Sequence, residues 1–172
     1  MIKALTIWQP WASLIAIGAK PYEFRGWAPP PWLVGKDLGI HAGARPVRLA
    51  EVLELIERLE QPERHETPCL RREPALVLLR QVRDGLGARR PGGLLPDEPE
   101  PFRLPLSCVL GTATVGRPKR GDDCAREFDS SHGNDSGRSD TFNWGWPLLD
   151  FKPFMPPIEA KGAQGLWNWM EP

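Results

Sequence analysis

The chain has 172 residues, of which 41% are hydrophobic and 26% are charged. This length suits one domain with a hydrophobic core, and the composition is that of a soluble globular protein, which argues against wholesale disorder and membrane embedding. The 22 basic and 22 acidic residues balance, so no overall positive charge indicates non-specific binding of nucleic acid. The N-terminal residues do not resemble a signal peptide, and no apolar run is long enough to span a bilayer. We therefore expect a single cytoplasmic domain, residues 1–172, without membrane association.

The three cysteines give no sign of a cofactor. Cys69, Cys108 and Cys124 are separated by 39 and 16 positions, a spacing that fits no zinc or redox motif. We expect free thiols, no metal site and no cofactor.

The first part of the chain predicts a strand, a short helix and two further strands. Residues 3–8 alternate between apolar and polar side chains, as a half-buried strand does. Pro10 suits the start of a helix, and Gly18 supplies its left-handed end. Residues 22–27 return to an extended pattern, and residues 38–42 are short and apolar, as expected of a buried strand.

Residues 46–105 form a predicted insertion. Within it, residues 47–60 carry apolar side chains along one helical face and charged side chains opposite, which predicts an amphipathic helix. Residues 61–105 are rich in proline, arginine and acidic residues, so we expect a partly mobile linker. The apolar residues 75–79 within it offer an alternative, a helix with a basic side. The same segment offers one alternative function for the chain, the binding of a protein partner.

Three more strands are predicted in the second half, at residues 106–115, 142–149 and 166–170. The intervening residues 116–141 are dense in serine, aspartate, asparagine and glycine and predict a long surface loop. Five or six short strands, two clear helices and no repeating βαβ pattern favour an α+β fold with a mixed sheet or small barrel.

All eight tryptophans lie near the ends of the chain, and none falls between Trp32 and Trp144. Because aromatic rings bury much apolar area, we expect the two ends to pack together. Trp144 and Trp146 lie two positions apart in a predicted strand and share one face. Core packing is the ordinary role of such a pair, and one exposed ring would offer a surface on which a ligand stacks.

Three charged residues fall within six positions of the segment 18–25. In an extended strand Glu23 and Arg25 point to the same face, and Lys20 lies in the turn before it. Charges so close to core segments must be paired or lie in a solvated cleft. One interpretation is a structural ion-pair network. The other is a polar cleft in which Lys20 and Arg25 contact phosphate and Glu23 accepts a hydrogen bond.

Five segments together resemble the ASCH domain, a family of the PUA-like superfamily. The pattern Gly-x-Lys-x-x-Glu-x-Arg at residues 18–25 is specific when it follows a short helix and precedes a strand, as predicted here. The other segments read WQPWASLI at 8–15, GIHA at 39–42, FNWGW at 142–146 and KGAQGLW at 161–167. With the strand at 106–115, the resemblance covers somewhat over half of the chain.

The resemblance implies a small PUA-like mixed β-barrel with flanking helices and a cleft lined by residues 18–25. It also implies binding of RNA or another single-stranded nucleic acid, or of a nucleotide or modified nucleoside. The candidate ligand-binding residues are Gln9, Lys20, Glu23, Arg25, His41, Trp144, Trp146 and Gln164. Trp144 is the expected stacking residue.

Some ASCH proteins are hydrolases, which raises an enzymatic alternative. The resemblance to a bacterial member that hydrolyses N4-acetylcytidine gives Lys20 the place of a catalytic lysine, but Glu23 stands where that enzyme has a threonine. A carboxylate cannot act as that hydroxyl nucleophile, so the amidase mechanism does not carry over. If the chain is an enzyme, Lys20 and Glu23 are the expected acid–base pair of a metal-independent hydrolase acting on RNA or an acylated nucleoside. We rank a non-catalytic binding module first.

Overall fold

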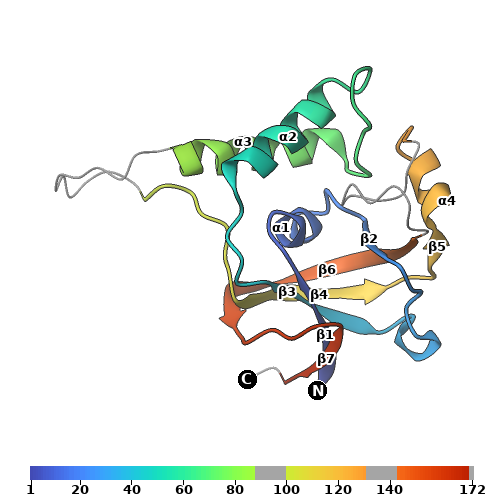
Figure 1. Cartoon of the computed structure of the whole chain (residues 1–172). Helices are drawn as coiled ribbons and strands as arrows, with labels where there is room; N and C mark the ends of the chain where they lie inside the picture. Colours follow the sequence, from blue (N-terminus) through green and yellow to red (C-terminus); the bar gives the residue numbers. More distant parts are fainter. Residues whose placement is uncertain (88–99, 131–142, 171–172) are drawn as a thin grey trace.

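The computed structural model describes residues 1–87, 100–130 and 143–170, which form an α+β fold (Figure 1). A mixed seven-stranded sheet curves into a half-barrel, and helices flank it. The predicted fold class is confirmed. In chain order the elements are β1 (Ile2–Ile7), α1 (Trp11–Ala16), β2 (Tyr22–Arg25), η1 (Pro31–Leu33), β3 (Asp37–Ala42), α2 (Leu49–Glu60), α3 (Arg72–Gly87), β4 (Cys108–Val115), β5 (Lys119–Arg120), α4 (Gly121–Arg126), β6 (Trp144–Glu159) and β7 (Leu166–Trp169).

The sheet brings the two ends of the chain together. Its strand order is β2-β6-β4-β3-β1-β7, and β5 pairs with β6. β1 pairs in parallel with β3 and antiparallel with β7, so that Ile2 lies opposite Trp169. β2 pairs antiparallel with β6, which sets Arg25 opposite Trp144. The predicted packing of the two tryptophan-rich ends is confirmed.

The helix α1 begins and ends as its sequence predicts. Pro10 directly precedes its first residue, and Gly18 has a φ of 71° just after its end, in the left-handed region that glycine adopts without strain. Only a short turn then leads to β2. This connection places Lys20 directly before the strand that carries Glu23 and Arg25.

The strand β6 extends well beyond the predicted end at Leu149, because it continues to Glu159. Prolines at 153, 156 and 157 argue against a regular ladder of hydrogen bonds. The prediction that the strand ends at Leu149 rested on this argument and is wrong. The register between β4 and β6 shifts between Val109 and Gly111 and again between Thr112 and Thr114. These irregularities let a proline-rich strand remain in the sheet. Phe142, the predicted first residue, lies outside the described residues.

The insertion contains two helices rather than one helix and a linker. α2 agrees with the predicted helix, but α3 occupies residues that we expected to be a linker. Pro74 is compatible with a helix because it lies in the first turn. Buried side chains of both helices pack against Leu14 of α1 and against Ala19, and together they form a second hydrophobic cluster. Residues 88–99 of the predicted linker lie outside the described residues.

The predicted loop at 116–141 also contains regular structure. β5 and α4 lie in its first part, and residues 131–141 lie outside the described residues. The Tyr22 hydroxyl group donates a hydrogen bond of 2.5 Å to Glu127 at the end of α4, and Lys119 donates to both residues. These contacts fasten α4 to β2.

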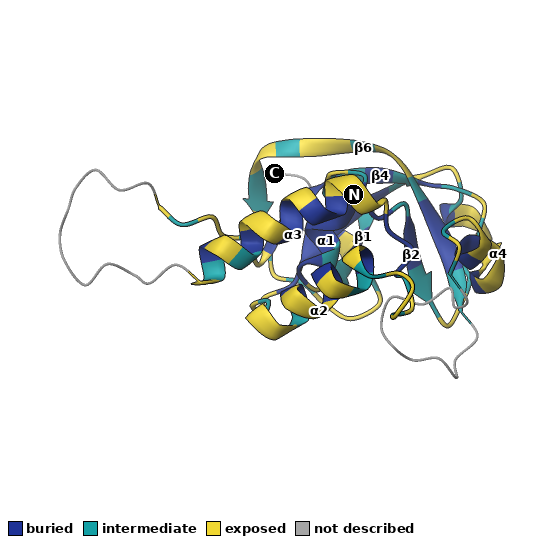
Figure 2. Ribbon diagram, turned by 90° about the horizontal axis from the view of Figure 1, so that it is seen from above, coloured by how far each residue is buried: buried dark blue, intermediate teal, exposed yellow. Residues whose placement is uncertain are grey.

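The main hydrophobic core lies between α1 and the sheet, and a second cluster lies within the α2–α3 hairpin (Figure 2). In the part of the chain that the structure describes, no helix has the length and apolar character needed to cross a membrane. The three cysteines are buried, and no disulfide bond joins them.

Candidate functional site

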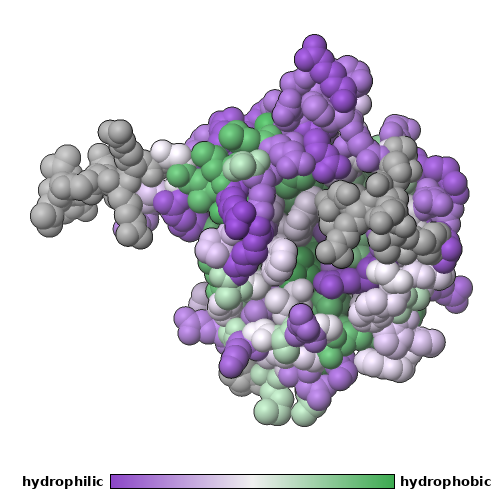
Figure 3. Space-filling model, viewed as in Figure 1, coloured by the Kyte–Doolittle hydropathy of each residue, from purple (hydrophilic) through white to green (hydrophobic). Residues whose placement is uncertain are grey.

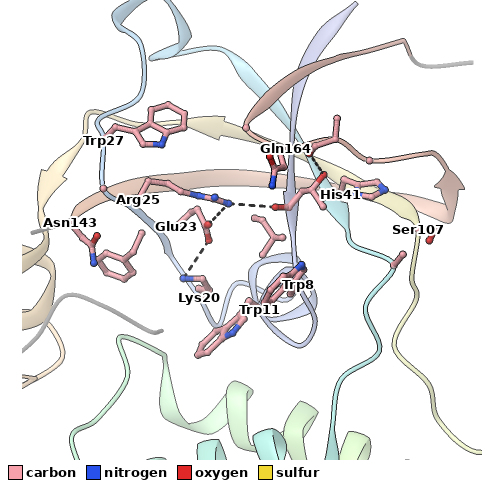
Figure 4. A pocket seen from close by; sticks show the side chains of 18 of the residues that line it. Trp8, Trp11, Lys20, Glu23, Arg25, Trp27, His41, Ser107, Asn143 and Gln164 are labelled. Carbon is pink, nitrogen blue, oxygen red and sulfur yellow. Dashed lines mark hydrogen bonds and ion pairs between the residues drawn. The ribbon is translucent and has the colours of Figure 1, made fainter. Parts of the chain in front are cut away.

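A cavity of about 1050 Å³ opens beside the segment that carries the three charged residues (Figure 4). Its size reaches the upper end of the range for pockets that bind small molecules. Side chains and backbone from β1, β2, β3 and the loop between β6 and β7 surround it. The lining residues are Thr6, Ile7, Trp8, Trp11, Lys20, Glu23, Phe24, Arg25, Gly26, Trp27, His41, Ala44, Ser107, Asn143 and residues 161–165.

Lys20, Glu23 and Arg25 converge on one wall of this cavity. Glu23 Oε1 lies 2.8 Å from Arg25 Nη2, and Glu23 Oε2 lies 3.7 Å from Lys20 Nζ (Figure 4). The shared face of Glu23 and Arg25 follows from the two-residue period of β2. The structural ion-pair network and the polar cleft, the two interpretations of this segment, are therefore compatible, because the ion pairs themselves form part of the cavity wall.

The ammonium group of Lys20 is held by the protein itself. Its side chain is only 1% exposed, and Nζ donates a hydrogen bond of 2.6 Å to the Tyr22 carbonyl oxygen. The rings of Trp11 and Phe24 lie 5.4 and 5.1 Å from Nζ. Burial lowers the pKa of Lys20 to about 8, although the nearby Glu23 carboxylate opposes this shift. These contacts make Lys20 the cation that positions Glu23.

His41 projects from β3 and is buried in the cavity wall. Its Nε2 donates to the Ala160 carbonyl oxygen at 2.9 Å, since a carbonyl can only accept. Burial lowers the pKa of His41, so the ring is neutral at pH 7. Nδ1 is then a buried acceptor, and it has no hydrogen-bond partner among the described residues. Gly162 packs closely against this ring, so that a Cβ atom added at residue 162 would lie only 2.7 Å from Nδ1.

Gln9 does not line the cavity, so its predicted role in ligand binding requires correction. Its Oε1 accepts from the Ser13 backbone N–H at 3.1 Å, and its Nε2 donates to Ser13 Oγ and to the Pro105 carbonyl oxygen. Both amide hydrogens are thus used within the protein. Gln9 ties α1 to the segment that precedes β4. Gln164, by contrast, is exposed and does line the cavity.

Trp144, the predicted stacking residue, and Trp146, a second predicted ligand-binding residue, are also absent from the cavity lining. Trp146 is completely buried, and its Nε1 donates to the Trp27 carbonyl oxygen at 2.9 Å. Trp144 is partly buried against the core, with the Arg120 guanidinium group 4.6 Å from its ring centre. These two side chains share the face of β6 that is turned to the core. This agrees with core packing, the ordinary role of two tryptophans spaced two positions apart in a strand.

Sequence reasoning missed the two tryptophans that are exposed in the cavity. Trp8 is 59% exposed and Trp27 is 41% exposed, and both line the cavity. Each lies just beyond the end of a strand, next to Gln9 or Gly26, where the chain leaves the sheet. That position at a strand end is the feature of the sequence that distinguishes them from the tryptophans inside strands.

No trio of histidine, cysteine, aspartate or glutamate side chains is placed to share a metal ion within residues 1–87, 100–130 and 143–170.

Comparison with known proteins finds similarity to solved structures alone. No family model matches the chain, and no curated protein matches it. The crystal structure of ASCH from Zymomonas mobilis is 13% identical in sequence, with a TM-score of 0.49, and the match covers 98% of this chain and 87% of that chain. A mutant form of the same protein, ZmASCH, is 14% identical, with a TM-score of 0.48 and the same coverage. Both solved structures are of one ASCH protein, and each match extends over almost the whole length of this chain.

Proposed function

We propose that the chain is a binding module that holds an unpaired base of RNA, or of a nucleotide or modified nucleoside, in the cavity beside Lys20, Glu23 and Arg25. The observation that supports this function is the presence of two exposed tryptophans, Trp8 and Trp27, in the same cavity as a paired carboxylate. The ASCH-like motifs in the sequence favour the same class of ligand.

The tryptophans provide the apolar part of the interaction. The Arg45 guanidinium group lies 4.8 Å from the ring centre of Trp8, and Trp146 meets Trp27 edge to face at 4.7 Å. These contacts hold both rings, yet much of each ring remains exposed. Stacking of a base on such a ring contributes about 1–3 kcal/mol and does not depend strongly on base identity.

Glu23 provides the polar part. Two cations hold its carboxylate in place, and each oxygen has a further lone pair to accept a hydrogen bond. The amino group of a base and a ribose hydroxyl group are donors of the required kind. Because the carboxylate is held before the ligand arrives, little ordering is needed on binding.

The test uses fluorescence anisotropy with a labelled single-stranded RNA of eight nucleotides, the same sequence in DNA, and the RNA duplex. We expect the single strands to bind more tightly than the duplex, and Trp8→Ala or Trp27→Ala to weaken RNA binding about tenfold. Trp32→Ala is the matched control, because Trp32 is 56% exposed but does not line the cavity. Equal affinities of all three variants and the wild type would contradict the proposal.

A second function, hydrolysis of RNA or an acylated nucleoside, is favoured by one specific observation. Lys20 has a pKa of about 8 and lies beside Glu23 in the cavity wall, as an acid–base pair requires. The test is incubation with labelled RNA and with N4-acetylcytidine, with and without a chelator. Turnover that resists the chelator and is lost in Lys20→Met would establish the hydrolase. Absence of turnover in every condition would leave the binding module.

Binding of a protein partner through the insertion stays a prediction. Figure 3 shows hydrophobic residues gathered over the α2–α3 hairpin, and the exposed apolar side chains of the segment from Pro62 to Pro105, for which this role is predicted, include Val77 and Phe102.

A further inference from the structure

The cavity wall carries more cationic than anionic side chains, although the net charge of the whole chain is zero. The charged side chains that line it are three cations, Lys20, Arg25 and Lys161, and one carboxylate, Glu23. Lys20 is buried against Glu23 and the Tyr22 carbonyl oxygen. The remaining two cations, Arg25 and Lys161, are the ones available to a ligand.

Arg25 holds unused donors in a fixed position. Its Nη2 is paired with Glu23 Oε1 and lies 3.5 Å from the Thr6 carbonyl oxygen. Its Nε is buried without an acceptor among the residues that the structure describes. The Arg25 side chain as a whole is 28% exposed, so a ligand can reach donors of its guanidinium group other than the buried Nε. The guanidinium group is therefore oriented but not saturated.

Lys161 is presented by a loop that is fastened on both sides. The Ala160 carbonyl oxygen accepts from His41 Nε2, and the Ala163 carbonyl oxygen accepts from Thr6 Oγ1 at 2.9 Å. The Lys161 side chain is exposed and forms no ion pair with any residue that the structure describes. Its ammonium group is thus available while its backbone is held.

Thr6 brings the two cations to the same part of the wall. Its carbonyl oxygen lies 3.5 Å from Arg25 Nη2, and its hydroxyl group donates to the Ala163 carbonyl oxygen in the loop that carries Lys161. One residue of β1 therefore contacts both Arg25 and the Lys161 loop. A guanidinium group and an ammonium group on one concave wall are the donors that bind a phosphate group.

We propose that Arg25 and Lys161 form a phosphate subsite of the cavity, so that its ligand is a phosphate-bearing nucleotide or strand rather than a free nucleoside. This inference rests on the proposed function. It assigns phosphate to Lys161 together with Arg25, and it leaves Lys20 as the residue that positions Glu23.

The experiment compares uridine, uridine 5′-monophosphate, uridine 3′-monophosphate and the dinucleotide UpU by isothermal titration calorimetry. We expect at least one phosphate-bearing probe to bind about tenfold or more tightly than uridine. The probe that gains most shows whether the subsite takes a terminal phosphate or a phosphodiester. Lys161→Gln should remove most of that gain and leave the affinity for uridine unchanged. Lys36→Gln is the control, since Lys36 is exposed and outside the cavity.

A second variant and a second probe separate the possible failures. Arg25→Lys keeps a cation beside Glu23 but removes the guanidinium donors, so it should also lose the preference for phosphate while its melting temperature shows that it is folded. Inorganic pyrophosphate tests the subsite without a base, and it should raise the melting temperature of the wild type more than that of Lys161→Gln. If pyrophosphate does so but no uridine compound binds, the proposed function fails and the subsite stands. If Lys161→Gln responds to every probe as the wild type does, the subsite is overturned, whether or not nucleosides bind.

Discussion

Glu23 and Arg25 form an ion pair of 2.8 Å on one face of β2, with the Glu23 side chain only 8% exposed. The same carboxylate faces the buried ammonium group of Lys20. Taking charges out of water is costly, and removal of one partner leaves the others uncompensated. Removal of the shared carboxylate would therefore leave two cations of the cavity wall uncompensated.

Glu23→Gln should lower the free energy of unfolding by about 3 kcal/mol, because two cations lose their shared carboxylate. Chemical denaturation at pH 7 measures this. Asp84→Asn is the control, since the pair of Asp84 with Arg83 is exposed and should contribute at most about 1 kcal/mol. Equal losses in the two variants would show that the Glu23 network does not stabilise the fold.

The buried lysine should make stability depend on pH. The pKa of Lys20 is about 8 in the folded chain, against an ordinary value of 10.5, because of its burial. Between these values the unfolded chain binds the proton that the folded chain has lost, so stability contributed by this group rises with pH. Burial raises the pKa of Cys69 and Cys124, which has the opposite effect above pH 9.

Comparison with Lys20→Met isolates the lysine from the thiols. From pH 8 to pH 10.5, the wild type should gain about 3 kcal/mol of unfolding free energy relative to Lys20→Met. The exposed Lys36 provides the control. The difference in unfolding free energy between the wild type and Lys36→Met should hardly change with pH. A flat difference for Lys20→Met as well would mean that the lysine is not held as the structure places it.

Gly162→Ala should displace the loop that carries Lys161. The added Cβ would lie 2.4 Å from His41 Cε1, which is closer than atoms approach. Overpacking of this kind costs about 1–3 kcal/mol, so both the melting temperature and the affinity for a ligand in the cavity should fall. Gly26→Ala is the control, because Gly26 lines the same cavity and its added Cβ meets no atom within 4 Å. The prediction is wrong if both alanine variants behave alike.

The insertion should influence the cavity through Arg45. This side chain stacks on Trp8 and forms an ion pair with Glu51 in the first turn of α2. Although burial would raise it, the pKa of Glu51 is held below its usual value by Arg45 and by the Arg48 backbone N–H. Glu51→Gln should weaken RNA binding about threefold, because Arg45 holds the Trp8 ring less firmly.

A double-mutant cycle measures this coupling. In a Trp8→Ala background, Glu51→Gln should have no further effect on RNA affinity. Glu54→Gln is the control, since Glu54 is exposed on the same helix. If Glu51→Gln weakens binding equally with and without Trp8, the effect does not pass through the tryptophan.

The parts of the fold that the sequence predicts correctly are those in which one local pattern decides the structure. β1, α1 and α2 follow from alternation, from a helix end at Gly18 and from an amphipathic repeat. The prediction failed for α3 and for the second half of β6, where prolines suggested irregular chain. α3 forms because its apolar side chains pack against α2 and α1. β6 continues past its prolines because its register with β4 shifts there. Both reasons lie in contacts between distant segments.

The sequence by itself determined that Glu23 and Arg25 share a face and that Lys20 lies beside them, because the two-residue period of a strand is a local property of the backbone. Only the tertiary structure decided which aromatic and polar side chains surround them. Trp144 and Trp146 are turned to the core by the position of β6 in the sheet, while Trp8 and Trp27 lie at strand ends and remain exposed. Residue 161 lies far along the chain from residue 25, and Thr6 relates them through β1. Burial and proximity depend on how strands pair across the whole chain, so no local pattern reveals them.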